Sequence, residues 1–187
     1  MKVDEQLIQG CIDRDRRAQY TLYKQCFGLM MSICYRYTNH REDAEEMLNL
    51  AFLKVLTNLE SYRSDFPFGS WLRRVTVNSI IDQYRKNKKY KENEVHLDSP
   101  EDIRTERVDL NMADLDFEAE ELKIMIMELP PMTRQVFNLY AIDGYKHAEV
   151  GEMLGISEGT SKWHLSNARK TLKKRILERT NALRYEE

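Results

Sequence analysis

The segment from Glu92 to Asp116 is acidic and poor in apolar residues, and it divides the chain into two parts. Between Glu92 and Glu128 there are thirteen Asp and Glu residues against three Lys and Arg. Such a segment cannot bury enough apolar surface to fold by itself, and the early Pro100 also disfavours regular structure. We therefore predict a flexible acidic linker at residues 92–116, between domains at residues 1–91 and 117–187.

Both parts are expected to be helical. Apolar residues make up 42% of the 187 residues, which is enough for a folded chain. Ala, Leu, Met, Lys, Arg and Glu dominate, only seven Gly and four Pro occur, and almost no run alternates apolar and polar residues. These features predict an all-α protein made of two small helical domains.

Two basic segments flank the acidic one. Residues 63–91 contain eight Lys or Arg against two acidic residues, and residues 162–179 contain seven against one. The formal net charge of the chain is only −2, which argues against a uniformly basic nucleic-acid coat protein. Any basic surface must therefore be local.

The cysteines and the N-terminus indicate the compartment. Cys11, Cys26 and Cys34 form no CxxC pair and lie in helix-like apolar patterns, as reduced buried thiols do. No apolar run resembles a signal peptide or approaches the roughly 20 residues of a membrane span. We expect a cytoplasmic protein without direct membrane insertion.

The segment EDAEEMLNLAFLKVLTNLESY predicts an amphipathic helix with two surplus leucines. Leu50 and Leu53 project from the side opposite the core, where a solvated face should be polar. Either they pack on another helix of the same domain, such as QYTLYKQCFGLMMSICYRYT, or they contact a partner protein. The predicted core stripe consists of Ala44, Met47, Leu48, Ala51, Phe52, Val55, Leu56 and Leu59.

The next segment, SYRSDFPFGSWLRRVTVNSIIDQYRKNKK, combines aromatic with basic side chains. Its SDFPFG part is typical of a turn, and we expect Phe66 and Phe68 to be exposed there. A helix is predicted to start at Ser70, whose hydroxyl can cap the first free amides. One stripe of this helix, expected to be polar and basic, contains Arg74, Asn78, Ile81 and Arg85.

Single-stranded nucleic acid is bound where hydrogen-bond donors to its phosphates lie next to aromatic rings on which unstacked bases can stack. The segment therefore predicts a surface for single-stranded nucleic acid. The alternative is an ordinary solvated helix face with a lysine-rich end. Trp71 fits either the core or a wedge between bases.

The segment ELPPMTRQVFNLYAIDGYKHAEVGEMLGISEGTSKWHLSNARKTLKKRI has the order of a helix-turn-helix. A helix led in by Pro130 and Pro131 is followed by a break at Asp143 and Gly144, then by a short helix. Gly151 stands where a closely crossing helix would need no side chain. The short helix has apolar positions at Ala148, Val150, Met153 and Leu154.

A turn at Gly155 and Ile156 then leads to the last helix, which Ser157 caps. Thr160, Leu165, Ala168 and Leu172 are expected to face inward. An exposed helix with donors at successive turns fits the major groove of duplex DNA. Its outward residues are Lys162, Trp163, His164, Ser166, Asn167, Arg169 and Lys170.

Trp163 is unusual among these polar residues. It either lies against a thymine methyl and sugar or covers the core of its own domain. The alternative for the whole segment is a plain helical hairpin with a basic last turn, which the helix dipole favours.

These segments together resemble the extracytoplasmic-function (ECF) sigma factors, the promoter-recognition subunits of bacterial RNA polymerase. REDAEEMLNLAFLKVLTNL resembles the helix that docks on the clamp helices of the largest polymerase subunit. In many relatives, Gln and an acidic residue stand where this chain has Asn49 and Leu50. The resemblance implies a docking face formed by Asp43, Glu46, Asn49, Leu50 and Leu53.

The resemblance also implies two DNA-reading surfaces. SYRSDFPFGSWLRRVTVNSIIDQYRK resembles sigma region 2, which recognises and melts the minus-ten element and captures a flipped base. This implies contacts by Tyr62, Arg63, Ser64, Asp65, Phe66, Phe68, Arg74, Asn78 and Arg85. GISEGTSKWHLSNARK resembles the minus-thirty-five helix of sigma region 4, although Trp163 and His164 stand where Ser and Arg are frequent. This implies contacts by Ser161, Lys162, Trp163, His164, Ser166, Asn167 and Arg169.

The implied function is promoter-specific transcription initiation. The implied partners are core RNA polymerase, promoter DNA and an anti-sigma factor, which can hold the cytoplasmic protein at the inner membrane. The family also implies that the linker threads toward the RNA-exit path. We expect no catalysis, cofactor or metal, since the chain has no glycine-rich phosphate loop and no metal-ligand spacing among its four histidines. Base capture can offset an unstacking cost of a few kcal/mol without nucleotide hydrolysis.

Two alternatives come from other classes. The protein could be a stand-alone helix-turn-helix regulator, but such a protein has no need of the second basic and aromatic block at Arg63 to Lys91. It could also be an enzyme that uses the acids from Glu92 to Glu121 as metal ligands, but an unstructured linker cannot fix their geometry.

Overall fold

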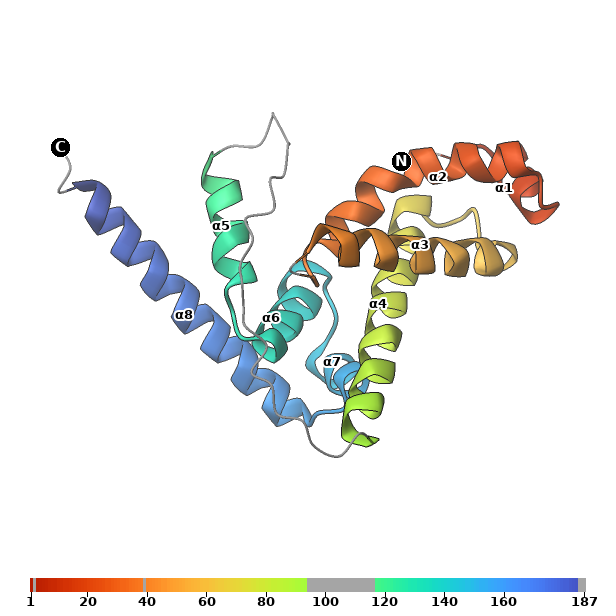
Figure 1. The fold of residues 1–187 in the computed structure, drawn as a ribbon. Coiled ribbons are helices and arrows are strands. Elements are labelled where there is room, and N and C mark those ends of the chain that lie inside the picture. The colour runs from red at the N-terminus through yellow and green to blue at the C-terminus, as the bar shows by residue number, and fades with distance from the viewer. Residues whose placement is uncertain (2, 39, 94–116, 185–187) are drawn as a thin grey trace. The chain divides into compact units, whose positions relative to one another are not determined.

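The computed structural model describes residues 1, 3–38, 40–93 and 117–184, and the regular elements within these ranges are helices (Figure 1). This confirms the predicted all-α class. The chain divides into two compact units, Met1–Val108 and Asp109–Glu187. Residues 94–116 of the predicted linker lie outside the described residues, so the proposed domain boundaries stay a prediction. Among the described helices, none combines the length and the apolar character that a membrane span requires.

In the first unit, α2, α3 and α4 pack against one another, and α1 packs on α2. Their fully buried side chains include Leu22, Met30 and Ile33 from α2, Leu48 and Val55 from α3, and Leu72 and Val77 from α4. The elements are α1 (Glu5–Ile12), α2 (Arg16–Cys34), α3 (Arg41–Asn58), the 3-10 turn η1 (Leu59–Ser61) and α4 (Phe68–Asn93).

The predicted core stripe of α3 is largely confirmed. Met47 and Leu56 are half-buried at its edges. The stripe as a whole faces α2 and α4, because α3 packs against both helices. The opposite face of α3 is therefore left to solvent. The buried members are Ala44, Leu48, Ala51, Phe52, Val55 and Leu59.

The three cysteines are free and buried, as expected. Burial raises the pKa of Cys26 and of Cys34 to about 12. Both side chains are therefore neutral thiols at physiological pH and act as small apolar residues of the core.

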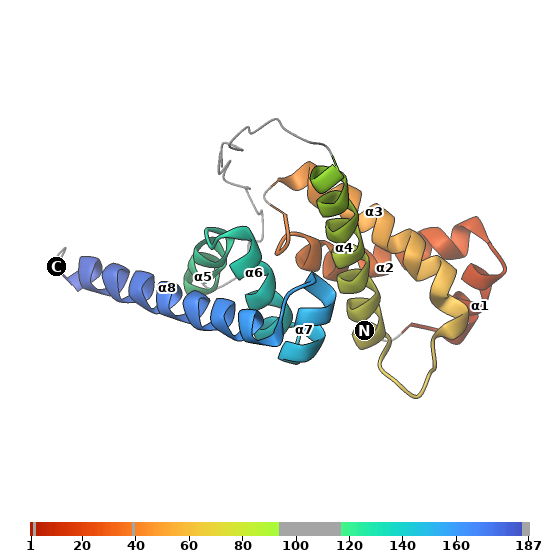
Figure 2. The same ribbon diagram turned by 90° about the horizontal axis from the view of Figure 1, so that it is seen from below.

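The second unit is built on a long helix, α8. Helices α6 and α7 pack on α8 (Figure 2). The second half of α8 pairs through Arg179 with Glu121 of α5 and through Arg175, at 2.8 Å, with Glu128, the residue after α5. The elements are α5 (Phe117–Met127), α6 (Pro131–Phe137), the π-helical η2 (Asn138–Ile142), α7 (His147–Leu154) and α8 (Glu158–Arg184). The predicted helix-turn-helix order is confirmed.

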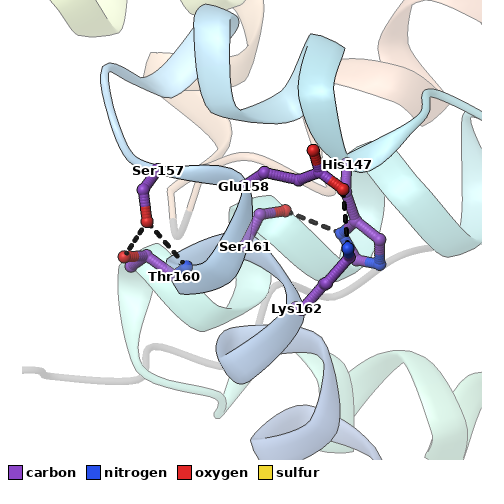
Figure 3. Close-up of polar contacts among 6 residues, drawn as sticks. All are labelled: His147, Ser157, Glu158, Thr160, Ser161 and Lys162. Atoms are coloured by element: carbon purple, nitrogen blue, oxygen red, sulfur yellow. Dashed lines mark hydrogen bonds and ion pairs between the residues drawn. The ribbon is translucent and has the colours of Figure 1, made fainter.

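The breaks between these helices occur at the predicted glycines. Gly144 and Gly155 have φ angles of +80° and +66°, which L-residues with a side chain rarely adopt. Ser157 caps α8 as predicted, since its Oγ accepts a hydrogen bond from the Thr160 backbone N–H at 3.0 Å (Figure 3).

Gly151 is needed for a different reason from the one predicted. A Cβ atom on Gly151 would lie 2.8 Å from the backbone oxygen of Ile156. The close neighbour is thus the turn itself and not a crossing helix. The same two residues are joined by a 3.0 Å hydrogen bond from Ile156 N–H to the Gly151 carbonyl.

Candidate polymerase and DNA interfaces

The outer face of α3 carries all five predicted docking residues in exposed positions. Leu53 is 60% exposed and Leu50 is 38% exposed. The hypothesis that these leucines pack on another helix of their own domain is therefore wrong. Since Asp43 and Glu46 lie on the same face, the surface is apolar with acidic residues toward the N-terminal end of the helix.

Helix α2 extends this face with aromatic residues that the sequence reasoning missed. The Tyr23 hydroxyl donates to Asn49 Oδ1 at 3.2 Å, and its ring meets Phe52 edge-on at 5.0 Å. The exposed ring of Phe27 is 5.8 Å from that of Tyr23. The signal was the four-residue spacing of these two aromatics on one helix face. We call Tyr23, Phe27, Leu50 and Leu53 the apolar ridge.

The loop before α4 presents one aromatic side chain to solvent and buries another. Phe66 is 62% exposed, whereas Phe68 is buried. The expectation that both are exposed is wrong for Phe68, because α4 begins at this residue and not at Ser70. The Phe68 ring lies 5.1 Å from that of Tyr62 and 5.4 Å from that of Trp71. Phe68 therefore supports the loop from inside.

Tyr62 holds the loop in shape. It is half-buried, and its hydroxyl donates to the Phe66 carbonyl at 2.7 Å. This bond closes the loop around Arg63, Ser64 and Asp65, whose side chains are exposed. Phe66 is thus presented from a closed loop and not from a free strand.

Helix α4 exposes Arg74, Asn78 and Arg85 on one side, as predicted. Ile81 does not belong to this stripe, because it is buried in the core with Ile80 and Val77. Arg73, which the sequence reasoning did not single out, lines a hollow beside the loop. The other residues of this hollow are Met1, Leu29, Pro67, Gly69 and Ser70.

On α8 the predicted contact residues fall into three groups. Lys162, Trp163, Ser166 and Arg169 are exposed. His164 and Asn167 are half-buried at the edge of the helix. Ser161 is fully buried. A buried hydroxyl cannot reach a DNA base, so Ser161 is corrected to a structural residue. Leu165, Ala168 and Leu172 are buried, as predicted.

Ser161 helps to position His147 (Figure 3). Its Oγ lies 2.9 Å from His147 Nδ1, and the His147 ring stacks on Tyr140 at 4.1 Å. Burial, followed by the nearby charge of Lys162, lowers the pKa of His147. The ring is therefore mainly neutral at pH 7.

His147 borders a basic hollow between α7 and α8 that suits an anion such as a phosphate. Lys162 lies at its edge, in a 2.6 Å ion pair with Glu158 (Figure 3). The sequence reasoning missed His147 and Lys173 here, although positions 162, 166, 169 and 173 have the spacing of one helix face. The hollow is lined by His147, Lys162, Leu165, Ser166, Arg169, Lys170 and Lys173.

Trp163 does not cover the core of its domain. Its side chain is 61% exposed, so that hypothesis is wrong. Its ring meets His164 edge-on at 4.8 Å, and His164 Nδ1 is 3.0 Å from Thr133 Oγ1. Burial lowers the pKa of His164.

The described residues contain no group of three His, Cys, Asp or Glu side chains that could hold a metal ion. Most of the acids from Glu92 to Glu121 lie outside these residues.

Comparison with known proteins decides the family. The chain matches Sigma-70 region 2 at residues 22–90 and Sigma-70 region 4 at residues 119–172. It is 30% identical over 151 residues to the ECF RNA polymerase sigma factor SigW of Bacillus subtilis, covering 77% of this chain and 81% of SigW. The chain belongs to the ECF sigma factors.

Other relatives are similar to this sigma factor. SigM of Mycobacterium tuberculosis is 27% identical over 169 residues, which covers 90% of this chain and 82% of SigM. Among solved structures, the sigma factor RpoE of Bartonella quintana, in complex with the anti-sigma factor NepR, has a TM-score of 0.47 and 17% identity. That likeness covers 82% of this chain and 95% of RpoE.

The protein is thus a transcription initiation factor that acts with RNA polymerase at promoters. The alternative of a stand-alone helix-turn-helix regulator is wrong, because the first unit carries sigma region 2. Sigma factors are not themselves catalysts.

Proposed function

We propose that the two units of this sigma factor read separate parts of one promoter. Residues 1–91 dock on core RNA polymerase and hold the opened minus-ten element, residues 117–187 read the minus-thirty-five duplex, and residues 92–116 connect them. The observation that carries the proposal is the division of the basic, aromatic-bearing surfaces between two compact units.

The apolar ridge is the proposed docking surface for the clamp helices of the largest polymerase subunit. Aromatic side chains such as Tyr23 and Phe27 are enriched at the centres of protein interfaces, and the two leucines add exposed apolar area beside them. The acidic residues Asp43 and Glu46, with Asn49, lie on the same side of α3 and would meet polar or basic groups at the edge of the partner.

The loop before α4 is the proposed site for a flipped non-template base. Phe66 offers an exposed ring for stacking, and Tyr62 fixes the loop that carries it. The hollow lined by Arg73 lies beside this loop. Phosphates of the separated strand would be bound by the exposed cations Arg63, Arg74 and Arg85, while Ser64, Asp65 and Asn78 offer hydrogen bonds.

Helix α8 is the proposed minus-thirty-five helix. Lys162, Ser166 and Arg169 present donors along one exposed side, next to the basic hollow at His147. A helix with this arrangement suits the major groove, with a backbone phosphate at the hollow. His164 and Asn167, being half-buried, are proposed as contacts at the edge of that interface.

An anti-sigma factor is a further proposed partner, and the cytoplasm is the proposed location, with the inner membrane as the site of restraint. The neutral, buried thiols support a reducing compartment.

In-vitro transcription tests the proposal as a whole. Core RNA polymerase mixed with the full chain is expected to start RNA synthesis at discrete promoters, selected from genomic fragments bound by this sigma factor. Core polymerase alone is the control. Absence of start-site-specific RNA above this control would overturn the proposal.

The proposal that the loop before α4 and helix α8 bind different parts of the promoter gives a separate prediction. In the holoenzyme, Phe66→Ala is expected to weaken binding to a pre-opened minus-ten bubble about tenfold, because stacking contributes about 1–3 kcal/mol per base. Its affinity for the upstream duplex should not change. Lys170→Ala should instead weaken duplex binding and reduce the slope of log affinity against log salt by about one.

Fluorescence anisotropy with each DNA separately, over a range of salt concentrations, measures these effects. If either variant lost the same affinity for the bubble as for the duplex, the proposal of two separate DNA-binding surfaces would be contradicted.

A further inference from the structure

Trp163 lies near the centre of the exposed face of α8. Its position is about 160° around the helix from the buried Ser161 and about 180° from the buried Leu172. It is 61% exposed, although an indole of this size is normally covered. Lys170, two turns later, has almost the same angular position. The apolar ring is therefore surrounded by the polar and basic side chains of the proposed DNA-binding face.

Gly159, one turn before Trp163, is not required by the packing of the domain. A Cβ atom there would lie 3.7 Å from Ser157 Oγ, which is an ordinary contact. Glycine inside a helix destabilises it by comparison with alanine. Side chains on a helix lean toward its N-terminus, so Gly159 is on the side toward which Trp163 leans. Apart from Ser157 Oγ, no neighbouring atom lies within 4 Å of that Cβ position, so the surface one turn before Trp163 is open.

The indole is also held in position. His164 contacts its ring edge-on at 4.8 Å and is itself bonded to Thr133 on α6, with 3.0 Å between the His164 Nδ1 and Thr133 Oγ1 atoms. Because α6 packs on α8, this chain of contacts fixes Trp163 relative to the rest of the unit. An aromatic ring that is held in one position and keeps one face exposed is suited to binding a ligand group.

The charges around Trp163 favour DNA over a protein as the occupant. Lys162 precedes it and Lys170 lies two turns later at almost the same angular position, and both side chains are exposed. In the major groove, the apolar group on an unmodified base edge is the C5 methyl of thymine. We propose that Gly159 and Trp163 form a site for a thymine methyl within the minus-thirty-five element. This proposal rests on the proposed role of α8 as the minus-thirty-five helix.

The test uses the full chain assembled with core polymerase. Duplexes with a randomised upstream region are selected for binding, and each enriched thymine is then replaced by deoxyuridine, which lacks only the methyl. At one position we expect the wild-type affinity to fall about fourfold, as for loss of one buried methylene-sized group. In Trp163→Ala this penalty should disappear.

Two further variants separate recognition from folding. Gly159→Leu fills the open space and should weaken binding to the selected duplex at least tenfold, while thermal unfolding shows an intact domain. Lys170→Ala, the matched control, should weaken binding but keep the full penalty for deoxyuridine.

Each remaining outcome overturns the inference. If no sequence is enriched, the proposed role of α8 fails, and this inference fails with it. If sequences are enriched but no thymine methyl matters, or if the penalty persists in Trp163→Ala, only the thymine site fails. Tighter binding of 5-methylcytosine than of thymine at that position would reassign the site to methylated cytosine. Loss of polymerase binding alone in Trp163→Ala would reassign the ring to a protein contact.

Discussion

Replacing Leu50 and Leu53 together by Asp is expected to weaken binding of this sigma factor to core RNA polymerase by at least about 100-fold. Both side chains lie on the solvent face of α3, so the double variant should fold normally. In the proposed complex they become buried, and two carboxylates without partners would lose their hydration there. The change therefore acts on the complex and not on the free protein.

Affinity for fluorescently labelled core polymerase measures the effect, and circular dichroism with thermal unfolding reports the fold. Gln25→Asp with Ser32→Asp is the matched control, because it adds the same charge at two exposed positions of α2. Normal polymerase affinity in the leucine variant would refute the docking surface. An equal loss in the control would show that added negative charge alone is responsible.

The second large effect is expected from Gly151→Ala. The new Cβ would lie 2.8 Å from the Ile156 carbonyl oxygen, and that oxygen belongs to the backbone of the turn. The turn must shift, which we expect to reduce the free energy of unfolding of the second unit by about 2–3 kcal/mol. Since small domains are stable by only about 5–15 kcal/mol, binding to the minus-thirty-five duplex should weaken as well.

Hydrogen exchange followed by mass spectrometry measures this effect separately in each unit. Amides of α7 and α8 should exchange faster in Gly151→Ala, while those of α2 and α3 should not change. Gly159→Ala is the control, because the structure has room for its methyl group. It should stabilise the second unit by up to about 1 kcal/mol. Equal behaviour of the two variants would contradict the tight turn at Gly151.

Local pattern was sufficient where a residue's surroundings come from its own helix. The three-and-four spacing on α3 identified Leu48 and Val55 as core and left Leu50 and Leu53 outside. The glycines at positions 144 and 155 and the capping Ser157 located the ends of the helices in the second unit. Such signals depend on backbone geometry within a few residues, so the sequence contains them directly.

Pattern was insufficient where packing between elements decided exposure. Phe68 and Ile81 were expected at the surface, but α4 starts two residues earlier than predicted and so includes Phe68, while Ile81 at the edge of the stripe is buried with Val77 and Ile80 by packing within the unit. Ser161 was expected to reach DNA, yet it faces α7 and bonds to His147. A rotation of α8 by a fraction of a turn would exchange such roles, and the sequence of one helix does not fix that rotation.

The sequence alone determined that this chain forms two helical parts, each with one basic segment, on either side of an acidic segment, and its motifs were enough to indicate an ECF sigma factor. Composition and short-range periodicity carry that information, because they set what each segment can bury. Only the tertiary structure decided which side chains face outward, brought Tyr23 beside Asn49, and left Trp163 uncovered beside Gly159. Contacts between distant segments depend on how helices are rotated and packed against one another, which no single segment specifies.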